Sequence, residues 1–433
     1  MQTDFTLAQL ADPDIQAAND ILRKCVHCGF CTATCPTFVL LGDELDSPRG
    51  RIYQIKGVLQ GDQAAGAEFT KHMDRCLTCL ACTTTCPSGV DYMHMIDHAR
   101  VVVEKDFTRP LPERLLREIL ALVLPRPGLF RLSLIGALFA RPFARLLPGR
   151  LKNLVGMAPA SIPGRSPVDR PQVFAAEGER RMRVALMTGC AQQVLRPAIN
   201  EATVRLLRRH GAEVVVADGV GCCGALVHHM GREKTAHDQA KANIAAWERA
   251  EESGGQFDAI VINASGCGTT VKDYGWMLRN DADWAARAER LASLTRDISE
   301  VMLELGLGEV TEAPRPVVTY HSACSMQHGQ KLKTQPVELL EAAGFEVRQP
   351  REAHLCCGSA GTYNIMQPAL AERLKARKLE NLRATDGAVV VTGNIGCLVQ
   401  LSGDGASAQP VVHSVELLDW ATGGPKPPEL ADL

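Results

Sequence analysis

The sequence has few aromatic residues, almost no net charge and no long uncharged apolar run. Aromatic residues make up 5% of the 433 positions, and 47 basic residues stand against 49 acidic ones. This balance argues against the strongly basic surface that nucleic-acid-binding proteins carry. Arginines interrupt the leucine-rich stretch 126–150, so it falls short of the roughly 18 uncharged residues of a membrane-spanning helix. We therefore expect neither a nucleic-acid partner nor a transmembrane helix.

A secretory leader and a nucleotide-binding glycine motif are also lacking. The first residues, MQTDFTLAQLADPDIQ, have neither the basic start nor the apolar core of a signal peptide, so we expect the protein in the cytoplasm. The chain between the first two cysteine motifs has no Rossmann-type glycine fingerprint. In a reducing cytoplasm, sixteen cysteines are poorly explained by disulfides, which makes metal ligation the leading explanation.

The cysteines fall into three groups, which divide the chain into modules. Eight lie within residues 25–86, four within 190–267 and four within 324–397. At 433 residues, of which 46% are hydrophobic, the chain is long enough and apolar enough to bury the cores of several domains. The predicted division is a helical domain over 1–105, an arginine- and proline-rich helical connector over 106–180, a first α/β module over 181–310 and a second over 311–433.

Both N-terminal motifs read C-x2-C-x2-C-x3-C-P, as CVHCGFCTATCP from Cys25 and CLTCLACTTTCP from Cys76. This is the spacing of two-cluster ferredoxins, in which three closely spaced cysteines bind one [4Fe-4S] cluster and the fourth binds the other. The motif is repeated because each copy completes its partner. The predicted ligands are Cys25, Cys28, Cys31 and Cys86 for the first cluster (set 1), and Cys76, Cys79, Cys82 and Cys35 for the second (set 2).

A pair of zinc sites is the alternative for these motifs. Zinc also takes four thiolates, typically from two C-x2-4-C pairs separated by a longer loop. The third closely following cysteine in each motif favours iron–sulfur clusters instead. Two neighbouring clusters would form an electron relay.

The second half of the chain is an internal duplication. GCAQQVLRP, GVGCCGAL and ASGCGTTV match HSACSMQHG, AHLCCGSAG and GNIGCLVQL, and 32 positions separate Cys190 from Cys222 as they separate Cys324 from Cys356. Each copy alternates strands with helices, which predicts a parallel sheet with the cysteines just beyond its carboxyl edge. The expected fold class is multidomain α+β and α/β, with a mostly helical, ferredoxin-like two-cluster domain followed by a duplicated Cys-Cys-Gly α/β domain.

Each copy has four cysteines, two of them adjacent and followed by glycine. These candidate metal sites are Cys190, Cys222, Cys223 and Cys267 (tetrad 1), and Cys324, Cys356, Cys357 and Cys397 (tetrad 2). We favour ligation of a further [4Fe-4S] cluster or of zinc, and the metal stays open; the alternative is buried reduced cysteine. Histidines also flank the loops, and each alone is more often a surface or hydrogen-bonded residue. They are His228, His229, His321, His328 and His354.

Together these motifs resemble the iron–sulfur subunit of bacterial glycolate oxidase over nearly the whole chain. The stretches that carry the resemblance include CVHCGFCTATCPTFVLLGDELDSPRGRIYQIKGVL, DRCLTCLACTTTCPSGVDY, LMTGCAQ, ASGCGTTVKDYG and HLCCGSAGTYNIMQP. Related motifs occur in iron–sulfur subunits of lactate utilisation systems, anaerobic glycerol-3-phosphate dehydrogenase and heterodisulfide reductase. In heterodisulfide reductase each module ends in C-x-x-C. Here Thr270 and Gln400 replace the last cysteine, which argues against disulfide-reducing chemistry.

The resemblance implies an electron-transfer subunit that is not catalytic alone. An FAD-containing partner in a hetero-oligomeric complex would oxidise glycolate to glyoxylate, and electrons would pass through this chain toward a quinone or other acceptor. The complex would lie on the inner face of the cell membrane, with residues 126–150 resting on anionic lipid or docked against a partner subunit. The alternatives are the iron–sulfur subunit of a D-lactate or glycerol-3-phosphate dehydrogenase, and a zinc-binding scaffold subunit.

Overall fold

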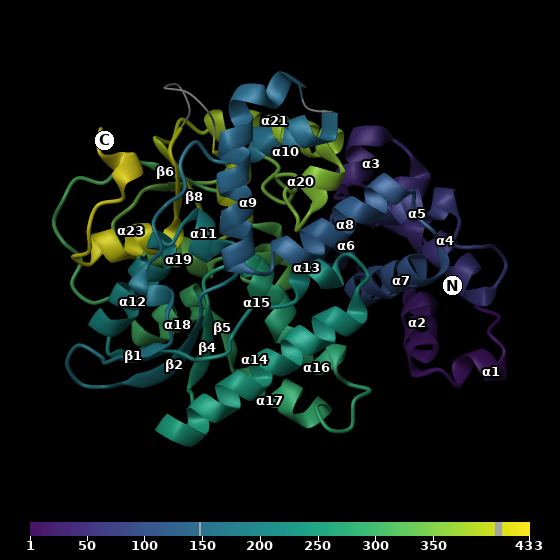
Figure 1. Ribbon diagram of the computed structural model, residues 1–433, viewed down its shortest axis with the longest axis horizontal. Coiled ribbons are helices and arrows are strands. Elements are labelled where there is room, and N and C mark those ends of the chain that lie inside the picture. Colours follow the sequence, from purple (N-terminus) through teal and green to yellow (C-terminus); the bar gives the residue numbers. More distant parts are fainter. Residues whose placement is uncertain (147–148, 403–408) are drawn as a thin grey trace.

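A helical N-terminal region and two sheets flanked by helices make up the structure (Figure 1). It is a computed structural model that describes residues 1–146, 149–402 and 409–433. The arrangement confirms the predicted fold class. The division at residues 105, 180 and 310 stays a prediction.

Short helices joined by the cysteine loops form the N-terminal region, at the right of Figure 1. Prolines begin several of them, because a first-turn proline has its φ angle already set and loses no intrahelical hydrogen bond. The helices close a core around Leu22, Ile55 and Met73, which also includes Cys25 and Cys76 and so anchors the loops. The elements are α1 (Leu7–Leu10), α2 (Pro13–Lys24), η1 (Phe30–Thr32), α3 (Pro36–Leu41), η2 (Glu44–Asp46), α4 (Pro48–Gln60), α5 (Ala67–Asp74), α6 (Ala81–Thr85) and α7 (Tyr92–Asp106).

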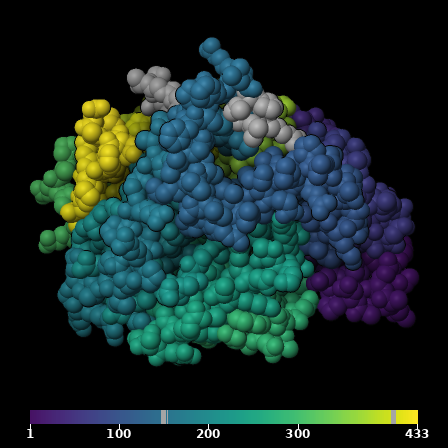
Figure 2. Space-filling model, in the orientation of Figure 1, coloured from purple at the N-terminus to yellow at the C-terminus, as the bar shows by residue number. Residues whose placement is uncertain are grey.

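The next helices run over the surface of the molecule and lead to the first sheet, as Figure 2 shows in blue. They are α8 (Leu111–Val123), α9 (Pro127–Ala140), η3 (Arg141–Leu146), α10 (Gly149–Met157) and η4 (Pro167–Asp169). On its inner side α9 packs Phe130 and Leu134 against Val194. Among the described residues, no helix is both long and apolar enough to span a bilayer.

The two sheets have the same strand order apart from one added edge strand. The first runs β1-β3-β2-β4-β5 and the second β7-β6-β8-β9, and all neighbours are parallel except β1 with β3. The repeated order confirms the duplicated parallel architecture. The strands are β1 (Gln172–Phe174), β2 (Met182–Met187), β3 (Ala212–Val216), β4 (Ala259–Ile262), β5 (Thr295–Asp297), β6 (Val318–Tyr320), β7 (Val347–Arg348), β8 (Val389–Thr392) and β9 (Val411–His413).

Helices cover both faces of each sheet. In the first copy they are α11 (Gln192–Leu195), α12 (Ala198–Arg209), α13 (Ala225–His228), α14 (Glu233–Gly254), α15 (Ser265–Lys272), α16 (Tyr274–Met277), α17 (Ala285–Leu294) and α18 (Ile298–Leu305). In the second they are η5 (Ser325–Gly329), α19 (Gln335–Ala342), α20 (Tyr363–Met366), α21 (Pro368–Arg383), α22 (Ile395–Leu401), α23 (Ser414–Ala421) and the terminal η6 (Pro428–Leu430).

The two copies are joined through a shared helical layer. Helices α12, α18, α19 and α23 lie between the two sheets (Figure 1), with α12 packed on α23 and α18 on α19. These pairs occupy equivalent places in the two copies. Helices α12 and α19 each connect the first two parallel strands of their copy, and α23 and α18 each follow the last strand of the other copy. One hydrophobic core extends from Val184 of β2 through this layer to Val390 of β8. The copies are therefore related by an approximate twofold arrangement around a common core.

An ion-pair cluster fixes the contact between α12 and α23. The buried carboxylate of Asp419 accepts hydrogen bonds from Nε of Arg205 (2.8 Å) and from Nη1 of Arg209 (3.1 Å). If this carboxylate loses its negative charge, the two guanidinium groups lose the charge that balances theirs, and the contact is destabilised.

Replacing Asp419 by asparagine is expected to destabilise the C-terminal half by about 2 kcal/mol. This would lower the midpoint of its thermal unfolding, measured by calorimetry, by roughly 4–8 °C. The matched control is Glu309→Gln at an exposed position, which should leave the midpoint unchanged. Equal midpoints for Asp419→Asn and the unmodified chain would show that the ion pairs contribute nothing to the joint.

Candidate metal centres

The two N-terminal cysteine loops adopt the same uncommon backbone. The residues on either side of the middle cysteine have positive φ in both motifs: His27 (54°) and Gly29 (83°) in the first, Thr78 (52°) and Leu80 (62°) in the second. Residues other than glycine rarely adopt this backbone conformation, which costs them on the order of 1 kcal/mol or more each. Strain repeated at matched positions indicates a functional constraint, and bends of this kind let three closely spaced cysteines face one centre.

Set 2 is buried, and Cys35 lies among the cysteines of the other motif. Burial, followed by the negative charges of neighbouring thiolates that include Cys35, raises the pKa values of the Cys79 and Cys82 thiols well above the usual value. Cys35 and Cys76 are buried as well. The structure thus brings together the four sulfurs that an exchanged fourth ligand requires, and the ligand assignment itself stays a prediction.

Set 1 lies nearer the surface. Cys25 is buried, Cys31 and Cys86 are half-buried, and Cys28 is exposed. Cys31 and Cys86 pack against the same apolar core as Cys25. Burial, and after it the charges of Cys25 and Cys35, raises the pKa of the Cys31 thiol to about 11. The two sets therefore differ mainly in how much protein separates them from solvent.

The chemistry of these thiols suits a bound metal centre. Crowded buried thiols stay neutral because desolvation and mutual repulsion disfavour thiolates. A bound cationic centre removes this penalty, and thiolate is the ligand form that such a centre requires. The donor chemistry in sets 1 and 2 therefore suits iron–sulfur clusters, whose ligands are cysteine thiolates.

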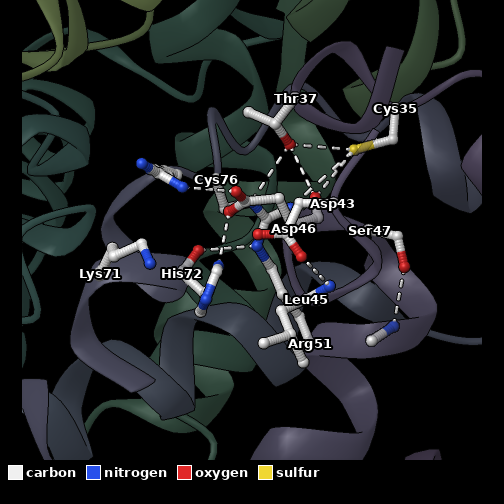
Figure 3. Close-up of polar contacts among 12 residues, drawn as sticks. Cys35, Thr37, Asp43, Leu45, Asp46, Ser47, Arg51, Lys71, His72 and Cys76 are labelled. Atoms are coloured by element: carbon white, nitrogen blue, oxygen red, sulfur yellow. Dashed lines mark hydrogen bonds and ion pairs between the residues drawn. The ribbon is translucent and has the colours of Figure 1, made fainter. Parts of the chain in front are cut away.

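A buried ionic network supports Cys35 (Figure 3). Arg51 donates from Nη1 to the Cys35 sulfur (3.9 Å) and from Nη2 to Oδ1 of Asp46 (3.1 Å). Asp46 also bonds to Nδ1 of His72 (2.9 Å) and accepts from Nη1 of Arg75 (2.7 Å). Arg51 and Asp46 are both almost fully buried. The network places a fixed positive charge beside a predicted cluster ligand.

Tetrad 1 assembles at the carboxyl edge of the first sheet. Cys190 follows β2, the adjacent pair follows β3, and Cys267 lies in the first turn of α15, which follows β4. The sulfurs of Cys190 and Cys222 are 3.6 Å apart. Contacts with the sulfurs of Cys222 and Cys267, together with burial, raise the pKa of Cys223 well above the usual value. The four cysteines meet where open parallel sheets bind ligands.

Tetrad 2 assembles in the same way at the second sheet. The sulfurs of Cys324 and Cys356 are 3.8 Å apart, and those of Cys357 and Cys397 are 3.5 Å apart. In addition, a ring nitrogen of His321 and the sulfurs of Cys357 and Cys397 all lie within 4.8 Å of one another. The second copy therefore offers a nitrogen donor along with its sulfurs.

Most of the histidines that flank the tetrads have other partners. His228 and His229 face the carboxylate of Asp97 in α7, at 3.3 and 3.8 Å. His328 bonds to a threonine hydroxyl of α6, and His354 is half-buried. Of the five, His321 is the one that approaches the cysteines.

Set 2 adjoins tetrad 2. Cys79 belongs to an apolar cluster with Cys356 and Tyr363, and Cys324 packs against it. After burial, the charge of Cys324 is the largest cause of the raised pKa of Cys79. Tyr363 donates to the carbonyl of Arg75, next to the second motif (3.1 Å). The N-terminal region thus sets its more buried cysteines against the second copy.

Sequence reasoning missed the charged residues behind the cysteines, namely Asp46, Arg51 and Lys378. Lys378 is buried, donates to the carbonyl of Glu352 (2.8 Å), and lies close enough to three cysteines of tetrad 2 for their charges to act on it. Charged residues without a recognisable spacing look like surface positions. Aligning the two copies position by position is the signal that could have distinguished Lys378.

Two protein-family models match the cysteine-containing parts of the chain. A model of the 4Fe-4S dicluster domain matches residues 21–90. A model of the cysteine-rich domain matches twice, at residues 184–272 and 318–402. Both matches to the cysteine-rich domain contain a complete tetrad.

Two curated relatives match nearly the full length. The chain is 42% identical to the glycolate oxidase iron-sulfur subunit of Escherichia coli (strain K12), over 97% of this chain and 99% of that protein. It is 32% identical to a protein of Bacillus subtilis (strain 168) named "Probable glycolate oxidase iron-sulfur subunit", over 93% and 94%. Lactate utilization protein A of Bacillus velezensis is 29% identical, over 51% of this chain and 91% of its own.

A solved structure shares the fold. A hypothetical protein from Helicobacter pylori superposes with a TM-score of 0.53 at 9% identity, covering 97% of this chain and 74% of that one.

Replacing Arg51 by glutamine is expected to lower the reduction potential of the cluster bound by Cys35. The guanidinium charge and its hydrogen bond to the sulfur favour the more negative, reduced cluster. Loss of one charge-assisted hydrogen bond corresponds to a shift on the order of 100 mV for one electron. An EPR-monitored redox titration measures this shift. Arg49→Gln is the control, because that side chain is one-third exposed and solvent screens its charge. An unchanged potential with full iron content would contradict the expectation.

Proposed function

The chain belongs to the family of glycolate oxidase iron–sulfur subunits, and we propose that it is the electron-transfer subunit of a complex that oxidises glycolate to glyoxylate. The observation that carries this proposal is the near-full-length match to two such subunits, together with sixteen cysteines, in four groups of four, that lie inside the regions matched by the family models. The substrate comes from the names of the relatives, because the flavin and glycolate sites are expected in a partner subunit.

The overall reaction balances as a two-electron oxidation. Glycolate gives two electrons and two protons to the FAD of the partner and becomes glyoxylate, and a quinone that takes up two electrons and two protons becomes a quinol. Clusters bound by sets 1 and 2 would supply one-electron carriers between the two. In this scheme the chain's residues supply thiolate ligands, exclude water from set 2, and set the local charge through Arg51.

The surface around Cys28 suits the docking of the flavoprotein. Val26, Phe30 and Tyr53 are each more than 60% exposed, although they are large and apolar or aromatic. They lie on or next to the loop that holds set 1. Exposed apolar side chains beside an exposed ligand favour a protein interface at this point. We infer that electrons enter from the FAD subunit on this side.

A cavity beside Cys76 suits the acceptor. It has a volume of about 400 Å³ and is lined by Cys76, Arg75, Arg100, Arg117 and Tyr363, among others. This volume is in the range of small-molecule sites. A quinone accepts hydrogen bonds at both carbonyl oxygens and gains negative charge during reduction, which guanidinium groups stabilise. We infer that the acceptor binds here, next to set 2.

The outer face of α8 and α9 supports attachment to the inner face of the membrane. Large apolar side chains on this face point to solvent, including Leu115, Leu122, Leu132 and Phe139. Residues 124–160 contain six basic residues and no acidic one. The basic residues are Arg126, Arg131, Arg141, Arg145, Arg150 and Lys152. Apolar side chains flanked by uncompensated positive charge match an anionic lipid surface.

A lactate-linked role is the second candidate. It is favoured by the match to lactate utilization protein A, which extends over about half of this chain. A D-lactate or glycerol-3-phosphate dehydrogenase would use the same electron-transfer parts with a different flavoprotein. A zinc-binding scaffold is the third candidate, and it predicts a colourless protein without acid-labile sulfide.

Cys28→Ser is expected to abolish electron transfer to quinone while leaving flavin reduction by glycolate intact in the assembled complex. Cys28 is exposed, so its substitution should spare the fold. Stopped-flow absorbance follows flavin reduction, and quinone reduction is measured separately. Thr32→Ser in the same loop is the control and should retain turnover. Normal quinone reduction by Cys28→Ser would exclude the relay role of set 1, and flavin reduction by lactate in place of glycolate would favour the second candidate.

The double variant Leu132→Gln/Phe139→Gln is expected to weaken binding of the complex to vesicles containing phosphatidylglycerol at least tenfold. Each side chain contributes on the order of 1.5–3 kcal/mol when it is fully buried. Vesicle co-sedimentation measures the loss. Leu7→Gln, at an exposed leucine of α1, is the control. Unchanged sedimentation, or loss of complex assembly in its place, would contradict lipid contact and favour a partner interface.

A further inference from the structure

We propose that His321 is a metal ligand and that the second copy holds a zinc ion through His321 and the thiolates of Cys357 and Cys397, completed by a thiolate of the Cys324–Cys356 pair. The proposal concerns metal binding in this chain and holds whichever substrate the complex oxidises. It distinguishes tetrad 2 from tetrad 1, although the two arose from one repeated unit.

The burial of His321 requires a partner for its ring. The side chain is 1% exposed, and neither ring nitrogen has a hydrogen-bond partner among the residues that the structure describes. A buried polar group without a partner costs about 1–3 kcal/mol. His321 directly follows β6, so the strand fixes its backbone at the sheet edge. A metal ion bound at this edge would take up one ring nitrogen.

The distances among His321, Cys357 and Cys397 suit a single tetrahedral ion. With zinc–sulfur bonds near 2.3 Å, two thiolates on one zinc lie roughly 3.8 Å apart, and a thiolate and an imidazole nitrogen slightly closer. The sulfurs of Cys357 and Cys397 are 3.5 Å apart, and a ring nitrogen of His321 lies within 4.8 Å of both. The side chain of Cys356 contacts that of Cys357, which places a fourth donor next to these three. Thiolates bound to different irons of a cubane cluster must lie farther apart, because they diverge from its corners.

The first copy lacks this nitrogen donor. His321 stands three residues before Cys324, and the residue three before Cys190 is Met187. Met187 is buried in the apolar core of the first sheet. Tetrad 1 therefore has no imidazole at the position that His321 occupies beside tetrad 2. Mixed sulfur and imidazole donors are typical of zinc, whereas cubane clusters take thiolates. The two copies therefore present different donor sets.

A second difference concerns charge. Lys378 on α21 is buried next to tetrad 2, where it lies within reach of the charges of Cys356, Cys357 and Cys397. The equivalent helix of the first copy, α14, carries Asn243, whose side chain bonds to the carbonyl of Cys222 (2.9 Å). Zinc with three thiolates and one neutral imidazole has one net negative charge. The ammonium of Lys378 would neutralise it.

The experiment measures the metal in the full chain purified anaerobically. We expect about one zinc per chain that resists dialysis against a chelator, and a zinc X-ray absorption spectrum that fits three sulfurs with one nitrogen at about 2.0–2.1 Å. His321→Leu should lower bound zinc at least fivefold and leave iron unchanged. His321→Cys should retain zinc and replace the nitrogen shell by sulfur, which a merely structural role of His321 would not cause.

The matched control is His210→Gln. His210 is also buried and also has one ring nitrogen without a partner among the described residues, but it lies at the end of α12. This variant should keep its zinc. If His321→Leu fails to fold, His321→Cys alone decides the question through its spectrum. Absence of zinc in the unmodified chain, or a nitrogen shell that persists in His321→Cys, would overturn the proposal.

Discussion

The structure depends on the compensation of negative charge on clustered, buried thiolates. Sixteen cysteines gather in four groups, and most are shielded from water. In such places burial and mutual repulsion hold thiols neutral unless a cation lies at the centre. A bound metal centre would supply such a charge, and the protein itself places Arg51 beside set 2 and Lys378 beside tetrad 2. The fold therefore has to deliver both sulfurs and fixed positive charges to the same points.

Two different backbone arrangements bring the cysteine sulfurs together. In the N-terminal region, closely spaced cysteines converge because strained left-handed residues bend short loops. In the duplicated region, cysteines far apart in sequence converge because parallel strands end at one edge. The two arrangements meet where Cys79 packs against Cys356. The buried sulfurs of the helical region and those of the second sheet thus form one continuous sulfur-rich interior.

The sequence predicts those features of the molecule that depend on regular spacing, namely the cysteine motifs and the duplicated strand order. The repeated strand order follows from the duplicated pattern, and the structure confirms it. The exchange of Cys35 into set 2 follows from the motif spacing and stays a prediction. The contacts behind them could not be predicted, because Asp46 reaches Arg51, His72 and Arg75 only through the packing of separate helices. His321 was one of five histidines that flank the loops in the sequence, and its closeness in space to Cys357 and Cys397 separates it from the rest. The contrast with Met187 was visible in the repeats, but it had no meaning until both were placed at a sheet edge.

The pairing of α12 with α23 has a consequence for biosynthesis. Helix α23 follows α12 far along the chain, so the apolar face of α12 stays uncovered until α23 has been synthesised. The first copy therefore cannot complete its core while it is being made, in contrast to independent domains, which fold one after another during synthesis. The N-terminal cysteine loops have no such dependence on α23 for their own core. The core that anchors set 1 can accordingly form early, whereas the surroundings of set 2, which packs on the second copy, and the paired sheets are completed only by later parts of the chain.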